Sequence, residues 1–228
     1  MINVIKIEKS FGEKKVLNSL SQDFITATVH GIIGLNGAGK TTFFNILSTF
    51  LKPDTGEILY EGKKITRNDI AYLETVIFFY SNITGKEYLE IFPSSNLQFD
   101  LDNINKLLKL PLDEIIETYS TGMKKKLALL AIIKQDKPIY IFDEPYNGLD
   151  LETNMALEII IKNLHAKQKT VFISSHILSP LINVCNEIHL LQQGNFIKNY
   201  FKENFNLIEQ ELFADFSKSA ADIIASSI

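Results

Sequence analysis

Cysteine is scarce in this sequence, long apolar runs are missing, and positive charge is not in excess. The one cysteine, Cys185, excludes an internal disulfide framework and indicates a reducing compartment; its side chain is expected to be buried. No stretch reaches the roughly 18 apolar residues of a membrane-spanning helix, and the N-terminus alternates apolar and polar residues, unlike a signal peptide. The net charge of −4 provides no basic field, so we expect no nucleic-acid partner.

The chain does have the length and apolar content of one compact domain, with 228 residues of which 46% are hydrophobic. Apolar patterning predicts strands over residues 2–8, 27–33, 57–60, 139–142, 171–174, 189–191 and 196–201. It predicts helices over residues 41–50 and 152–168, mostly helical structure over 84–135, and a short helix capped by Ser179, begun by Pro180 and ending at 188. Strand, helix and strand in this order indicate an α/β fold with a parallel sheet.

The segment "GLNGAGKTT" lies between a predicted strand and a predicted helix. Glycines at these spacings let backbone N–H groups converge on phosphate oxygens, and the helix N-terminus adds partial positive charge. Lys40 is expected to reach the β- and γ-phosphates of a nucleotide, and the Thr41 hydroxyl to bind Mg²⁺. The predicted phosphate-binding residues are Gly34, Leu35, Asn36, Gly37, Ala38, Gly39, Lys40, Thr41 and Thr42.

The segment "IYIFDEP" places two carboxylates at the end of a buried strand. Open α/β sheets bind ligands at this edge, and a buried carboxylate is costly without a cation. We therefore expect Asp143 to hold Mg²⁺ and Glu144 to polarise a water in line with the γ-phosphate. The alternative is an acidic pair at the surface.

The segment "YSTGMKKKL" puts three lysines after a Ser-x-Gly turn. Three interpretations of this segment are open: a solvated charged face, a patch that binds nucleic acid or membrane, or a backbone turn that holds an anion. Lysines in the first turn of a helix oppose the helix dipole, and an anion docked at that terminus would offset this penalty.

Taken in order, "GLNGAGKTT", "YSTGMKKKL", "IYIFDEPYNGLD" and "FISSHIL" closely resemble the nucleotide-binding subunit of an ATP-binding cassette (ABC) transporter. The resemblance covers about residues 2–201. It implies a P-loop NTPase core with a mixed, largely parallel sheet, an N-terminal antiparallel β subdomain and an inserted helical subdomain over about 76–135. The cassette is expected over 1–203, followed by a tail of unknown role over 204–228.

The resemblance also implies roles outside the phosphate loop. Ser120 and Gly122 match the signature loop, which caps the γ-phosphate of ATP bound to the other cassette. Thr121 and Met123 depart from the commonest form and are similar to antibiotic- and multidrug-type exporter ATPases. In this role the backbone turn is the functional element, and Lys124 to Lys126 only tune the field around it or remain solvated.

Further residues take their roles from the same family pattern. Asp150 resembles the residue that communicates across the dimer interface, and His176 the histidine that contacts the γ-phosphate. Phe11 resembles the aromatic residue that stacks on adenine, with core packing as the alternative. Thr75 stands where the family usually has glutamine and sometimes glutamate, so it would reach Mg²⁺ or the lytic water only through another water, unless Glu74 substitutes.

The implied function is that of an ATP-hydrolysing subunit that powers a membrane transporter, with ATP and Mg²⁺ as cofactors. The expected partners are a second cassette, in a homodimer or heterodimer, and a separate transmembrane permease. This places the chain in the cytoplasm, peripheral on the cytoplasmic face of the membrane. The alternatives are a soluble cassette ATPase acting on ribosomes or DNA and a weakly hydrolysing regulatory cassette. A GTPase is disfavoured, because residues 133–136 fail the guanine-reading pattern.

Overall fold

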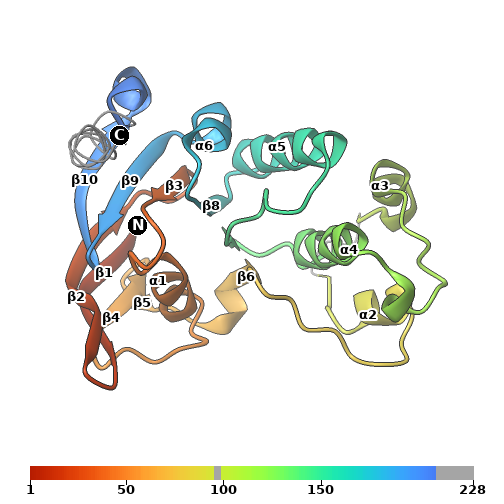
Figure 1. The fold of residues 1–228 in the computed structure, drawn as a ribbon, viewed down its shortest axis with the longest axis horizontal. Coiled ribbons are helices and arrows are strands. Elements are labelled where there is room, and N and C mark those ends of the chain that lie inside the picture. Colours follow the sequence, from red (N-terminus) through yellow and green to blue (C-terminus); the bar gives the residue numbers. More distant parts are fainter. Residues whose placement is uncertain (95–98, 209–228) are drawn as a thin grey trace, which may run out of the picture.

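The computed structural model describes residues 1–94 and 99–208 of the chain. Figure 1 shows two parts, with the β-sheets and their covering helices on one side and a group of helices around α4 on the other. Both termini of the described chain lie on the side of the sheets.

A four-stranded antiparallel sheet is built from the first 64 residues of the chain. Its strands pair in the order β2-β1-β4-β5. They are β1 (Ile2–Phe11), β2 (Lys14–Phe24), β4 (Thr55–Tyr60) and β5 (Lys63–Lys64). The implied N-terminal antiparallel sheet is thus present.

The main sheet has six strands in the order β10-β9-β3-β8-β7-β6. They are β3 (Val29–Ile33), β6 (Ile70–Leu73), β7 (Ile139–Phe142), β8 (Thr170–Ser175), β9 (Glu187–Gln192) and β10 (Asn195–Phe201). All neighbouring pairs are parallel except β9 and β10, which form the predicted hairpin. The expected mixed, largely parallel sheet is confirmed.

Helices cover both faces of the main sheet and form the second part of the molecule. They are α1 (Lys40–Leu47), α2 (Gly85–Glu90), α3 (Leu101–Leu108), α4 (Thr121–Lys134), α5 (Leu151–Ala166) and α6 (Leu178–Val184), with short 3₁₀ turns at Arg67–Asp69, Ile116–Thr118 and Lys202–Asn204. Helices α2, α3 and α4 share a separate apolar core.

Alternate residues of β7 show how the main sheet is buried on both faces. Ile139 and Ile141 belong to the core shared with α1 and the antiparallel sheet. Tyr140 and Phe142 belong to the opposite core, shared with α5 and α6. Such burial explains why this strand reads as an uninterrupted apolar run.

Cys185 lies in this second core and is fully buried, as expected. A Cβ added to Gly31 of β3 would lie 2.9 Å from its Sγ atom. Phe205 and Ile208 belong to the same core. Most of the predicted tail, residues 209–228, lies outside the described residues. Within the described ranges, no helix has both the length and the apolarity needed to cross a bilayer.

The predicted short helix around Ser179 and Pro180 has wrong limits. Helix α6 begins at Leu178, so both residues lie in its first turn, where backbone N–H groups have no partner within the helix and a proline is tolerated. The helix ends at Val184, because Ile188 pairs with Gly31 as part of β9.

Candidate active site

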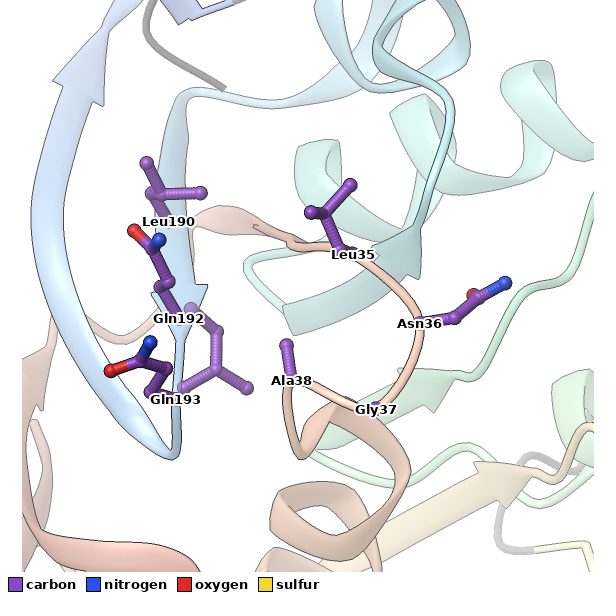
Figure 2. A pocket seen from close by; sticks show the side chains of 8 residues that line it. Leu35, Asn36, Gly37, Ala38, Leu190, Gln192 and Gln193 are labelled. Atoms are coloured by element: carbon purple, nitrogen blue, oxygen red, sulfur yellow. The ribbon is translucent and has the colours of Figure 1, made fainter. Parts of the chain in front are cut away.

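The phosphate loop joins the end of β3 to the start of α1 (Figure 2). Gly37 and Gly39 have φ angles of 84° and 108°, in the left-handed region that residues with a Cβ disfavour. Gly34 is required for space instead, because an added Cβ would lie 2.3 Å from the carbonyl oxygen of Leu191 in β9. The loop therefore packs closely on β9.

A small pocket of about 250 Å³ lies between the loop and the end of β9. In Figure 2, Ala38 faces this pocket, whereas Asn36 points away from β9. The turn after β9 also contacts the loop, since Gly194 N donates to the Ala38 carbonyl at 3.2 Å. Strand β9 and its turn thus hold the outer side of the loop, and the inner side remains open to a ligand.

Lys40 is the first residue of α1 and is only 7% exposed. Its Nζ donates to the Gly34 carbonyl at 2.7 Å and lies 3.5 Å from Oε1 of Glu144. The ammonium group is therefore held inside the loop by a carbonyl and a carboxylate. This position puts a fixed positive charge where the glycine pattern predicts phosphate oxygens.

Asp143 follows β7 and is fully buried. Its Oδ2 accepts from the hydroxyls of Thr41 at 2.7 Å and Thr75 at 2.8 Å, and its Oδ1 accepts from the Ser174 hydroxyl. The carboxylate therefore accepts hydrogen bonds from hydroxyl groups on three separate segments of the chain. Burial of an ionised group requires such partners.

These atoms form a set of hard oxygen donors at the mouth of the phosphate loop. Magnesium prefers carboxylate, hydroxyl and phosphate oxygens, and usually binds through one or two protein ligands plus the substrate. Asp143 and Thr41 fit that chemistry. The Thr75 hydroxyl donates to the same Oδ2 atom of Asp143 as the Thr41 hydroxyl does.

Glu144 occupies an unusual turn beyond β7. Its φ angle is 49°, in the left-handed region, and its backbone N–H donates to the Ser174 hydroxyl at 2.9 Å. Its Oε2 atom lies 2.9 Å from Nδ1 of His176. The turn brings a carboxylate and an imidazole together beside Lys40, which is a suitable arrangement for proton transfer from water.

Lys125 of α4 stabilises this turn by binding its backbone carbonyls. Its Nζ donates to the carbonyls of Glu144 at 2.9 Å and Asn147 at 2.6 Å. The residue is buried, and burial lowers the pKa of its ammonium, against the opposing effect of Glu144 and Asp143. For Lys125, the predictions of a solvated lysine and of a charge that only tunes the field are both wrong.

A cleft of about 610 Å³ collects most of the predicted residues. It is lined by Phe11, Lys14, Val16, Asn36, Gly37, Ala38, Gly39, Lys40, Thr41, Thr42, Thr75, Glu144, Asn147 and His176. Phe11 is 52% exposed at its rim, with Lys9 Nζ 5.7 Å from the ring centroid, so core packing is excluded for this side chain.

Ser120, Gly122 and Asp150 do not line this cleft. Ser120 caps α4 by accepting from the backbone N–H of Met123 at 3.2 Å. Asp150 caps α5. Hydrogen bonds from the backbone N–H and then the hydroxyl of Thr153, and the ammonium of Lys126, lower the pKa of Asp150 to about 2. Ser120 and Asp150 therefore stabilise the N-termini of α4 and α5, and neither helix N-terminus lines the nucleotide cleft of its own chain.

Glu74 and Thr75 are adjacent but have different surroundings. Thr75 lines the nucleotide cleft, whereas Glu74 lines a separate groove of about 740 Å³ between β6 and the helical part. Partial burial raises the pKa of Glu74, an effect that Arg67 opposes. Thr75, and not Glu74, therefore donates to the buried carboxylate.

Several contributors to the site were not predicted from the sequence, among them Val16 and Asn147, which line the cleft. Ser174 lies in the quoted segment "FISSHIL" but received no role, although a polar residue ending a buried strand was an available signal. Lys14 lines the cleft from β2, a strand that was not predicted. Nothing in the letters distinguishes Lys125 from the lysines on either side.

Comparison with known proteins identifies the family of the chain. The family model described as "ABC transporter" matches residues 17–147, more than half of the chain. The lantibiotic transport ATP-binding protein SrtF of Streptococcus pyogenes is 28% identical over 204 residues, covering 86% of this chain and 89% of that protein. The bacitracin transport ATP-binding protein BcrA of Enterococcus faecalis is 30% identical, covering 100% of this chain and 79% of that protein.

Solved structures share the fold. An ATP-binding subunit of an ABC transporter aligns with a TM-score of 0.84 and 23% identity, over 95% of this chain and 99% of that one. A dimeric ATP-binding cassette in a post-hydrolysis state, bound to ADP and Pi, aligns with a TM-score of 0.78 and 20% identity, over 89% of this chain and 99% of that one. The chain belongs to the ABC transporter family and is its ATP-binding cassette, an ATPase that drives transport.

Proposed function

We propose that the cleft binds Mg²⁺-ATP and that Glu144 is the general base for its hydrolysis. The proposal is supported most directly by the fully buried Asp143, whose carboxylate accepts hydrogen bonds from the Thr41 and Thr75 hydroxyls beside Lys40. Mg²⁺, held by Asp143 and Thr41, would neutralise phosphate charge when bound. Lys40 binds phosphate oxygens, Glu144 accepts a proton from the attacking water, and His176 orients the Glu144 carboxylate.

The second part of the proposal is a dimer with shared sites. Ser120 and Gly122 would close over ATP held by the partner cassette, and Asp150 would face the interface. Support comes from their position outside the cleft of their own chain and from the dimeric cassettes among the structural neighbours. A C2 arrangement satisfies both sites at once.

The third part concerns the membrane partner. The groove beside Glu74 has exposed apolar residues at its edge, including Phe50 and Tyr80, which are 50% and 55% exposed. A short amphipathic helix from a separate permease would bury them, with Arg67 and Glu74 available for polar contacts. We propose an exporter of peptide-type antibiotics, acting at the cytoplasmic face of the membrane, because the named relatives transport lantibiotics and bacitracin.

The test of the catalytic assignment is Glu144→Gln. The amide keeps the size of the side chain but cannot accept the proton, so phosphate release should fall by about 100-fold or more. Binding of a fluorescent ATP analogue should stay within about threefold of wild type, because Lys40 and Asp143 are unchanged. Turnover at the wild-type rate would remove Glu144 as the base.

A further inference from the structure

A cluster of three metal-ligating side chains lies in the sheet beneath the phosphate loop, outside the nucleotide cleft. His30 is on β3, and Glu187 and His189 are on the neighbouring strand β9. Both histidines are fully buried, and the Glu187 side chain is 13% exposed. Aromatic rings enclose the histidines, with Phe24 at centroid distances of 5.1 Å from His30 and 4.8 Å from His189.

The outward nitrogen of each imidazole is committed to an acceptor. Nε2 of His30 lies 2.8 Å from the carbonyl oxygen of Ile25, which can only accept, so Nε2 carries a proton. Nδ1 of His189 lies 2.9 Å from Oδ1 of Asn199. The Asn199 amide donates in turn to Gln22 Oε1 at 3.4 Å, and Gln22 Nε2 donates to a backbone carbonyl at 2.9 Å, which sets both amide orientations.

The inward nitrogens therefore present lone pairs when the rings are neutral. Nδ1 of His30 and Nε2 of His189 are 3.1 Å apart, and each lies 3.6 Å from Oε2 of Glu187. Three electron-rich atoms thus converge in a buried space, where a cation between them is needed to offset their mutual repulsion.

The spacing distinguishes a metal ion from a shared proton. A proton would join the two nitrogens and leave the carboxylate at 3.6 Å, beyond hydrogen-bond distance. In a tetrahedral zinc site with bonds of about 2.0–2.1 Å, neighbouring ligand atoms are about 3.3–3.4 Å apart. The three observed separations lie within a few tenths of an ångström of that value. The outer hydrogen bonds to Ile25 and Asn199 are the kind that orient metal-binding histidines.

We propose that His30, Glu187 and His189 bind one divalent transition-metal ion, of which Zn²⁺ is the best match to two imidazoles and a carboxylate. The ion joins β3 to β9. Strand β3 leads directly into Gly34, and the turn after β9 donates to Ala38. Binding would therefore stabilise both supports of the phosphate loop without taking part in hydrolysis.

The test uses the full chain, stripped with a chelator and kept in excess Mg²⁺ without nucleotide so that the cleft is occupied by the harder ion. Titration with Co²⁺ should give a visible absorption spectrum of a nitrogen- and oxygen-bound ion at one equivalent per chain. Zn²⁺ at a hundredfold above its Kd should raise Tm by about 5–10 °C.

Glu187→Gln keeps the size of the side chain and removes its charge, so it should weaken Co²⁺ binding by more than about tenfold. His189→Gln should abolish the spectrum. Two other histidines serve as matched controls: His165→Gln, at the end of α5, and His176→Ala, in the nucleotide cleft, should both keep it. The proposal is overturned if no ion raises Tm, or if only His176→Ala removes the spectrum.

Discussion

The three lysines that follow the Ser-Thr-Gly turn carry the same charge but have different surroundings. Lys125 is buried and holds two carbonyls of the catalytic turn, whereas Lys126 pairs with Asp150 at 3.1 Å. Lys124 is only half-buried. The charged run is therefore structural at its centre, because helical spacing turns Lys125 fully inward and leaves Lys124 and Lys126 partly exposed.

Lys125→Met should separate this structural role from a general effect of charge. Loss of two charge-assisted hydrogen bonds should lower the free energy of unfolding by about 1.5–3 kcal/mol, and release of the Glu144 turn should slow hydrolysis about tenfold or more. The measurements are urea unfolding and phosphate release. Lys124→Met is the matched control and should change stability by less than about 0.5 kcal/mol. Equal losses in the two variants would contradict the assignment.

At individual residues, the structure brings together the predicted residues that follow the ends of strands, and their roles stay predictions. Lys40, Thr41 and Asp143 meet because parallel strands deliver their C-terminal ends to one edge of the sheet. Ser174 and Lys125 were missed for a common reason. Both bind the backbone of a turn whose left-handed φ at Glu144 is not encoded by a glycine or asparagine.

At the scale of elements, the N-terminal sheet shows where periodicity misleads. In β1, Ile2 and Val4 are buried, but the next buried position is Ile7, because Lys6 has a φ of 47° and the pairing with β2 shifts there. Such a bulge breaks the two-residue period. Strand β2 was missed because its buried residues follow spacings of three and four. Strand β6 was not predicted either.

The turn between β9 and β10 is the element that we expect to matter most for the phosphate loop. Gly194 has a φ of 76°, and an added Cβ would lie 2.3 Å from the Val16 carbonyl. Gly194→Ala should therefore displace the turn from Ala38 and weaken ATP-analogue binding about threefold or more. Gly62 is a matched control, with a φ of 75° and nothing within 4 Å of its added Cβ.

Both alanine variants carry the strain of a left-handed residue, but only Gly194→Ala adds a clash. It should therefore lose about 1–3 kcal/mol more in the free energy of unfolding than Gly62→Ala. The comparison requires urea titration of both variants beside the binding measurement. Equal affinity for the nucleotide in the two variants would show that the turn does not position the loop.

At the scale of the whole molecule, the cradle for the triphosphate and the proposed lid belong to different parts of one chain. The cradle lies at the edge of the main sheet, and the lid lies at the start of α4. The α/β architecture was predictable because each part has its own local signals. The boundaries of the cassette and of the inserted helical subdomain stay predictions.

Mixing two inactive variants tests whether the sites are shared. Lys40→Ala removes the cradle, and Gly122→Asp removes the lid; an added Cβ at Gly122 has only an ordinary contact, 3.6 Å from Gly148 O, so this variant should fold. A mixed dimer combines the Gly122→Asp cradle with the Lys40→Ala lid and so has one intact site of two. Phosphate release should therefore reappear in the mixture, at up to about half of the wild-type rate.

Each variant alone should be nearly inactive, and light scattering should show ATP-induced dimers of the wild type but not of Gly122→Asp. A mixture that remains as inactive as its components would contradict the shared site. The informative comparison is between the rate of phosphate release by the mixture and the rate by each variant alone.

The buried position of Cys185 has a practical consequence for following these motions. Its thiol is fully buried, and burial raises its pKa, so it should be inert to maleimide reagents in the folded protein. A reporter cysteine introduced at an exposed position outside the cleft, such as Met155 of α5, can then carry a spin label or fluorophore without first removing the native thiol. Distances between two such labels would follow the opening and closing of a working pair in real time.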